Sequence, residues 1–137
     1  MLEIKYVDSG TVLNRPLSWC IVKCNGIKYK AYAKCLPEDE WSEFFGCYCA
    51  EVKASIKALT YELKKRKNYL TAMENLSKTL LGCSHLQREE SAYTKSVIKA
   101  FLMRQIGFQK RDIQQIKDRI SRLKKQLENR IKTRSNT

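Results

Sequence analysis

Two long stretches of this chain repeat apolar residues at alternating steps of three and four, the pattern of helices that pair along a seam, as in a coiled coil. In the first stretch no glycine or proline occurs between Cys47 and Leu81, which predicts a helix much longer than the globular average. We expect this helix over residues 41–82, with Gly82 ending it. Its apolar positions are Phe45, Cys49, Val52, Ile56, Leu59, Leu63, Leu70, Met73, Leu76 and Leu80.

The second stretch follows a polar connection, in which Ser84 or Ser91 is a candidate N-cap, and predicts a helix over residues 91–132. Two long helices joined by a short link favour an antiparallel helical hairpin. Because one small sheet cannot cover so much apolar edge, we expect the chain to form a homo-oligomer. The apolar positions are Leu102, Ile106, Ile113, Ile116, Ile120, Leu123 and Leu127, with Gln105 and Gln109 on or beside the same side.

The N-terminal residues predict a small antiparallel β-sheet within residues 1–36. A first strand is expected to end near Val7, because the turn-forming run Asp8-Ser9-Gly10 follows it. Asn25-Gly26 between two strand-like runs predicts a hairpin with a type I′ turn. Its second arm places two sets of side chains on opposite faces. One set is Ile27, Tyr29, Ala31, Ala33 and Cys35, and the other is Lys28, Lys30, Tyr32 and Lys34.

Pro37 and the acidic residues Glu38–Glu40 mark the passage from this β unit to the first helix. Proline cannot donate to a strand ladder, and carboxylates favour the positive end of a helix dipole. At 137 residues, the chain has the length of one domain. The expected fold is therefore a single α+β domain over 1–137, with a small sheet followed by two long antiparallel helices.

The formal charge of +13 indicates an anionic partner: a nucleic acid, a nucleotide or an acidic protein surface. No apolar run approaches the roughly 20 residues that span a bilayer, so a membrane partner is not expected. The N-terminus has no basic segment followed by an apolar stretch and a cleavage site, so we expect a cytoplasmic protein.

The six cysteines are expected to be reduced, buried apolar side chains in that compartment. The alternatives are a disulfide framework and a zinc site, the latter through Cys20/Cys24, Cys47/Cys49 and Cys83/His85. The first two pairs fall within apparent strands and a helix rather than in the turns that usually supply zinc ligands. We expect neither a metal nor another cofactor.

Catalysis has little support in the sequence. His85 is the single histidine and falls in the predicted connection, and no nucleophile motif or phosphate-binding glycine loop occurs. The carboxylates of Glu38, Asp39 and Glu40 can be read as an acid–base group, but a helix N-terminus explains them more simply. No catalytic residue is expected, and the chain is not expected to be an enzyme.

Basic residues instead dominate both helices, beginning with the run Lys64–Lys67 in the first. Lysines and arginines also solvate the outside of helical bundles, which is the ordinary explanation of such residues. In the second helix and its lead-in only five carboxylates offset them, and such uncompensated charge favours an anionic ligand. The basic residues along this helix include Lys99, Arg104, Lys110, Arg111, Lys117, Arg119, Arg122, Lys124 and Lys125, and the carboxylates are Glu89, Glu90, Asp112, Asp118 and Glu128.

A compact nucleotide site needs arginine for the phosphates and an aromatic ring for the base. Phe101, Arg104, Phe108 and Arg111 lie three or four residues apart on adjoining helix faces, and Gly107 thins the helix between them. The two rings can equally belong to a helical core. The alternative anion is an extended nucleic acid whose phosphates contact many basic residues along the helices.

One short segment resembles a known family. It runs Ala33-Lys34-Cys35, then Pro37-Glu38-Asp39-Glu40-Trp41, and continues with Gly46, Ala50 and Lys53-Ala54. It is similar to a segment of small phage-encoded proteins in which a β-hairpin precedes an acidic, aromatic helix start, a group that includes the anti-Thoeris sponge proteins. The match covers about fifteen to twenty residues.

This resemblance implies a phage anti-defence protein that acts in the host cytoplasm. Sponge proteins trap ADP-ribose-derived signals such as cyclic ADP-ribose isomers, and some also trap cyclic oligonucleotides, without degrading them. Because the match ends near Ala54, no binding residue is carried over from the family. Spacing and charge alone indicate Phe101, Arg104, Phe108 and Arg111, with Lys28 or Lys30 reaching the ligand from a neighbouring chain.

Two other functions are compatible with the same residues. One is a nucleic-acid-binding accessory protein that uses the basic helices. The other is a protein-directed inhibitor of a CRISPR nuclease or another defence effector, which would bind an acidic or nucleic-acid-binding groove.

Overall fold

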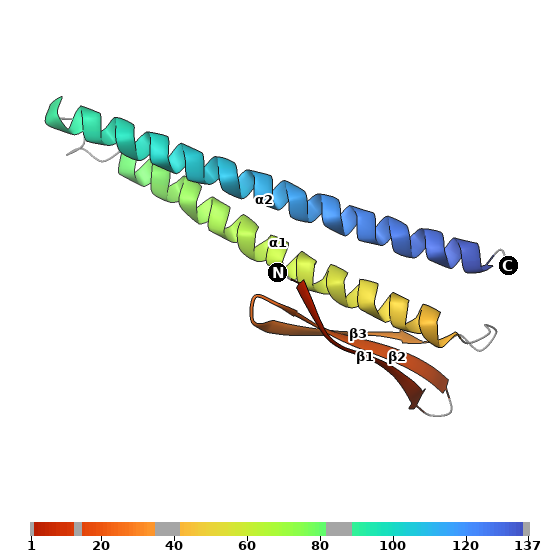
Figure 1. The fold of residues 1–137 in the computed structure, drawn as a ribbon. Helices are drawn as coiled ribbons and strands as arrows, with labels where there is room; N and C mark the ends of the chain where they lie inside the picture. The colour runs from red at the N-terminus through yellow and green to blue at the C-terminus, as the bar shows by residue number, and fades with distance from the viewer. Residues whose placement is uncertain (1, 13–14, 35–41, 82–88, 136–137) are drawn as a thin grey trace. The chain divides into compact units, whose positions relative to one another are not determined.

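A computed structural model of the chain describes residues 2–12, 15–34, 42–81 and 89–135, and it confirms the predicted α+β class (Figure 1). An N-terminal antiparallel sheet of three strands is followed by two long helices. The elements are β1 (Leu2–Val12), β2 (Arg15–Cys24), β3 (Ile27–Lys34), α1 (Glu43–Leu81) and α2 (Glu89–Ser135). Both helices were predicted, and their observed ends lie within a few residues of the expected ones.

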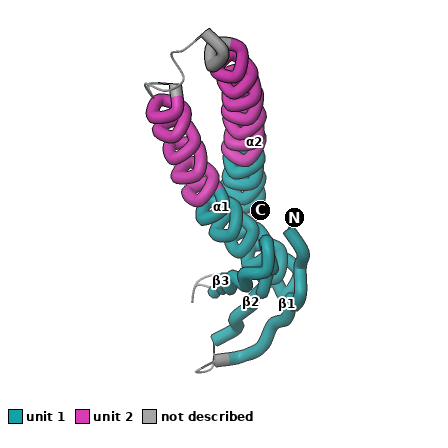
Figure 2. Tube along the Cα trace, turned by 90° about the vertical axis from the view of Figure 1, so that its left-hand side faces the viewer, with its two compact units in different colours: residues 1–62, 118–137 teal, residues 63–117 magenta. Residues whose placement is uncertain are grey.

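The chain divides into two compact units, which Figure 2 distinguishes by colour. Unit 1 contains residues 1–62 and 118–137, and therefore holds the sheet, the first half of α1 and the end of α2. Unit 2 contains residues 63–117, the remainder of the two helices. Each unit has its own apolar interior.

The sheet has the strand order β1-β2-β3, with both neighbouring pairs antiparallel. Cys24 pairs with Ile27 across the hairpin turn, whose central residues Asn25 and Gly26 have φ angles of 50° and 84°. Two successive positive φ angles are the signature of a type I′ turn, so the predicted hairpin is confirmed.

The prediction that β1 ends near Val7 is wrong. Asp8, Ser9 and Gly10 lie within the strand, where Ser9 pairs with Ser18 and Gly10 pairs with Leu17. Their local preference for turns is overridden because β2 begins early, at Arg15, and supplies backbone partners along the whole length of β1. A register shift between Ile4 and Tyr6 leaves Lys5 as an extra residue in β1.

The core of unit 1 forms where α1 lies on the inner face of the sheet. Cys20, Val22 and Cys24 of β2 are fully or almost fully buried there. Opposite them α1 contributes small residues at four-residue spacing, Ala50, Ala54 and Ala58, each with no exposed surface. Residues four apart share a helix face, so these alanines form a narrow stripe that lets the helix approach the strands closely.

The predicted cysteine burial is confirmed for Cys20, Cys24 and Cys49, whereas Cys47 is half-buried. None of these four cysteines forms a disulfide, and the Cys47 thiol donates to the hydroxyl of buried Ser18 across 3.9 Å. Cys35 and Cys83 lie outside the described residues. The buried cysteines thus act as small apolar side chains that fit beneath the alanine stripe.

The predicted seam of α2 is confirmed by burial. Leu102, Ile106, Ile113 and Ile116 are buried in unit 2, and Gln105 and Gln109 beside them are half-buried. The α1 segment of unit 2 is less covered, and its Leu76 is 52% exposed. The two segments are antiparallel and are joined by an ion pair of 3.0 Å between Arg66 and Asp112. Because that pair is partly exposed, it contributes at most about 1 kcal/mol.

Within the described residues, neither helix contains a stretch apolar and long enough to cross a bilayer.

The alanine stripe predicts a large penalty for added volume. Replacing Ala54 with leucine should lower the free energy of unfolding by about 1–3 kcal/mol, because the helix must move away from β2 to make room. The same replacement at Ala72, an exposed alanine of α1, should change it by no more than about 0.5 kcal/mol. Urea denaturation of both variants measures the difference, and equal values would contradict the close packing.

The buried thiol of Cys20 predicts a loss of stability at high pH. Burial, with a smaller contribution from the charge of Glu51, raises the pKa of Cys20 to about 11 from an ordinary value of 9.0. Between these values the unfolded chain releases the thiol proton and the folded chain keeps it, so unfolding becomes easier as pH rises. The free energy of unfolding should therefore fall more steeply from pH 9 to 11 in the wild type than in Cys20→Ala. Parallel curves for the two proteins would refute this assignment.

Candidate functional site

The four site residues predicted on the second helix all lie on the exposed side of α2 in unit 2. Phe101 is 60% exposed and Phe108 is 44% exposed, and Arg104 and Arg111 are exposed as well. Steps of seven residues relate Phe101 to Phe108 and Arg104 to Arg111, so each pair repeats along one side of the helix. The rings therefore do not belong to the unit 2 interior, which was the alternative explanation for them.

One of these contacts has the expected chemistry. The guanidinium of Arg111 lies 4.9 Å from the centroid of the Phe108 ring, which is a cation–π distance. A Cβ added at Gly107 would meet no described atom within 4 Å, so the surface between the two rings is open. This part of α2 therefore presents an exposed ring and a cation, rather than an enclosed site.

Lys28 and Lys30, the other predicted site residues, lie on β3 in unit 1. Both are exposed, and the ammonium of Lys30 lies 5.2 Å from the centroid of the Tyr32 ring on the same strand. The predicted division of the strand is confirmed, since Ala33 is buried while the lysines and Tyr32 face outward. The predicted residues thus form two groups, one in each unit.

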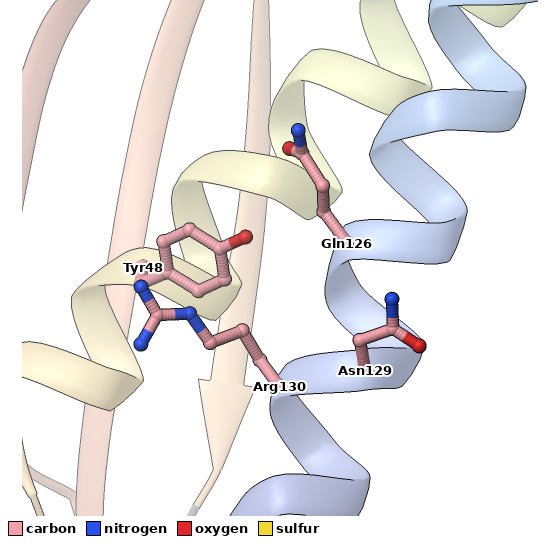
Figure 3. A pocket seen from close by; sticks show the side chains of 4 residues that line it. All are labelled: Tyr48, Gln126, Asn129 and Arg130. Atoms are coloured by element: carbon pink, nitrogen blue, oxygen red, sulfur yellow. The ribbon is translucent and has the colours of Figure 1, made fainter.

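A hollow of about 550 Å³ lies within unit 1, beside the alanine stripe (Figure 3). It is lined by Tyr48 of α1 and by Gln126, Asn129 and Arg130 of α2. The guanidinium of Arg130 lies 5.2 Å from the centroid of the Tyr48 ring, and Figure 3 shows the two side chains extending across the space between the helices. Tyr48 is half-buried and the three α2 residues are exposed, so the hollow opens widely to solvent.

The walls of this hollow are held by the unit 1 core. Tyr48 and Leu127 both pack against the cluster formed by the sheet and the alanine stripe. Gln126 and Arg130 stand one helical turn apart on α2, and the Arg130 guanidinium reaches the Tyr48 ring. The apolar contacts of the core therefore set the position of the polar groups.

The lining residues form a suitable set for a ring-bearing anion. A guanidinium stacked on an aromatic ring keeps its in-plane N–H groups, which can bind a phosphate through two parallel hydrogen bonds. The amide of Gln126 can donate to and accept from the edge of a base. Between residues 124 and 132 the charges are Lys124, Lys125, Arg130 and Lys132 against Glu128, which favours an anion.

The hollow was not predicted from the sequence. Tyr48 and Arg130 are far apart in the chain, and each looks like an ordinary surface residue of a long helix. Leu127 continues the predicted apolar seam of the second helix, and this was the one sequence feature that placed residues next to it near the first helix. No local pattern identified Tyr48 as their partner.

The described residues contain no group of three or more histidine, cysteine or acidic side chains arranged to hold a metal ion. Their buried side-chain nitrogen and oxygen atoms all have hydrogen-bond partners. His85 and the acidic run Glu38–Glu40, which the sequence analysis considered for catalysis, lie outside the described residues.

Comparison of the chain with protein-family models, with curated proteins and with solved structures finds no match.

Proposed function

We propose that this protein binds a small anionic nucleotide in the hollow lined by Tyr48 and Arg130, and holds it without converting it. The observation that carries the proposal is the placement of the Arg130 guanidinium over the Tyr48 ring at the edge of a hollow of about 550 Å³. That volume is within the usual range for sites that bind small molecules.

The chemistry of the lining favours a nucleotide over simpler anions. A phosphate alone needs only the guanidinium and gains nothing from a tyrosine ring or from an amide. A nucleotide uses all three kinds of group, because its base offers a flat ring and a hydrogen-bonding edge besides its phosphates. The positive excess of the surrounding α2 segment raises the local concentration of such anions.

Sequestration, rather than turnover, is the mode of action that the sequence supports. The resemblance of residues 33–54 to phage sponge proteins suggests a cyclic ADP-ribose isomer as the ligand, with cyclic oligonucleotides as a second class. A sponge needs affinity and abundance but no acid, base or nucleophile near the ligand. The Arg130–Tyr48 hollow supplies binding groups of that kind.

The exposed group Phe101, Arg104, Phe108 and Arg111 is a second location for the same chemistry. It has rings and guanidinium groups but no surrounding wall in unit 2, so a ligand bound there would stay largely in solvent. The hollow at Arg130 has side chains from both α1 and α2 around it, so a ligand there contacts more of the protein than a ligand on the exposed side of one helix. We therefore place the nucleotide at Arg130 rather than at Arg104 and Arg111.

Calorimetric titration with a panel of cyclic ADP-ribose isomers, linear ADP-ribose and cyclic dinucleotides tests this proposal. At least one nucleotide should bind saturably to the wild type. Arg130→Gln should weaken that binding about 10- to 100-fold, because a charge-assisted hydrogen bond contributes roughly 1.5–3 kcal/mol. Tyr48→Leu should weaken it as well while preserving the apolar contact with the core.

Two controls locate the site and the mode of action. Arg122→Gln removes the same charge from an exposed position of α2 outside the hollow and should bind like the wild type. The double variant Arg104→Ala and Arg111→Ala should also bind normally, whereas a loss confined to it would move the site to unit 2. Mass spectrometry of the nucleotide released by denaturation should show it unchanged, and a converted product would refute sequestration.

A further inference from the structure

The sheet of unit 1 has a second face, opposite the one covered by α1. Side chains alternate along β2, so burial of Ser18, Cys20, Val22 and Cys24 places the intervening residues on this outer face. No described element covers it. Its residues on β2 are Leu17, Trp19, Ile21 and Lys23, and the strand register places Gly10, Asp8, Tyr6 and Glu3 beside them on β1 and Lys34, Tyr32, Lys30 and Lys28 on β3.

Three aromatic rings, one from each strand, share this outer face. Trp19 lies directly opposite Tyr32, and Tyr6 lies opposite Ile21, the next outward residue of β2. Tyr6 and Tyr32 are 47% and 48% exposed. A Cβ added at Gly10 would lie 3.2 Å from the Trp19 indole, so the glycine leaves room for this ring to lie against β1. The rings therefore form a flat, partly exposed aromatic surface across the sheet.

A row of lysines borders the rings along β3. Lys28, Lys30 and Lys34 are exposed and point outward, with Tyr32 between the second and third. Alternate residues of a strand are about 6.7 Å apart, so the three ammonium groups follow a line of about 20 Å. In the described part of the chain, no carboxylate lies within ion-pair distance of these three lysines.

The carboxylates of the same face have other partners. Asp8 accepts hydrogen bonds from the Tyr6 hydroxyl at 2.7 Å and from the Ser9 amide at 2.8 Å, and Glu3 pairs with Lys5 at 2.8 Å. These bonds lower the pKa of both carboxyl groups, so both are ionised and engaged at neutral pH. The outer face thus has an internally paired acidic edge on β1 and a lysine edge on β3.

We propose that this outer face binds single-stranded nucleic acid, with bases stacked on Tyr6, Trp19 and Tyr32 and phosphates along Lys28, Lys30 and Lys34. Aromatic rings on an open sheet beside a line of cations are the usual means of holding unstacked bases without sequence readout. A duplex fits less well, because its bases are stacked on each other and cannot reach the rings. A second copy of this face fits poorly too, because its carboxylates are already paired and offer the lysines no anion.

This inference is independent of the nucleotide hollow, because the two sites share no residue. It also differs from the expectation that nucleic acid binds along the basic helices, since the cations named here belong to β3. From the sequence, Lys28 or Lys30 was expected to reach a nucleotide bound by a neighbouring chain. In this proposal both lysines bind the strand together with the rings of their own chain.

Fluorescence anisotropy with labelled 15-nucleotide strands of dT and of rU, and with a duplex of the same length, tests the proposal. Both single strands should bind at low salt, and more tightly than the duplex. The triple variant Lys28→Gln, Lys30→Gln and Lys34→Gln should bind at least tenfold more weakly. A plot of log affinity against log salt concentration should have a slope about 2 shallower for this variant than for the wild type. Each phosphate contact to a single strand contributes roughly 0.7 to that slope.

A matched control separates this surface from general positive charge. The triple variant Lys99→Gln, Lys110→Gln and Lys117→Gln removes three exposed lysines from α2 and should keep nearly wild-type affinity. Tyr32→Leu removes an exposed ring, with little effect expected on folding, and should weaken binding about tenfold through lost stacking. Thermal denaturation checks that each variant is folded.

Three results would overturn the proposal. The first is no binding of either strand by the wild type, and the second is equal loss in the two lysine variants, which would indicate unspecific attraction to the whole charged surface. The third is a change in oligomer mass on Tyr32→Leu, measured by light scattering, which would make this face an interface between copies. Tighter binding of rU than of dT, or the reverse, would support the proposal and show whether RNA or DNA is the preferred strand.

Discussion

The packing of the alanine stripe of α1 against the inner face of the sheet is the interaction on which unit 1 depends. The three strands have 11, 10 and 8 residues and share one apolar face, which must be removed from water by a packed partner. Ala50, Ala54 and Ala58 let the helix backbone approach Cys20, Val22 and Cys24 closely enough to exclude water. The small size of the side chains on both surfaces is therefore a requirement of the fold, rather than a sign of a loose core.

This contact also determines which groups remain for binding. Tyr48 packs against the same core cluster, and Arg130 of α2 covers its ring. Because α1 occupies the inner face of the sheet, Trp19, Tyr6 and Tyr32 are left on the outer one. Both proposed sites therefore consist of side chains next to the core residues, held in place by them.

The two sites have related chemistry but different shapes. Each combines aromatic rings with uncompensated cations, which suits ligands made of bases and phosphates. The hollow at Arg130 is small and has one guanidinium, one ring and one amide, so it suits a single nucleotide. The outer face is flat and spreads three rings beside three ammonium groups, so it suits a polymer. The excess of 13 positive charges draws anions toward both.

Elements that are specified by residues close together in the chain could be predicted from the sequence alone. Asn25-Gly26 predicted the hairpin because these residues tolerate the positive φ angles of a type I′ turn, and the three- and four-residue steps predicted both helices and the α2 seam. Alternation along β3 also assigned Lys28 and Lys30 to the exposed side. Features that depend on partners far away in the chain became visible only in the folded structure. Pairing with β2 drew Asp8-Ser9-Gly10 into a strand against their turn preference, and helix packing joined Tyr48 to Arg130, because neither contact leaves a pattern within either segment.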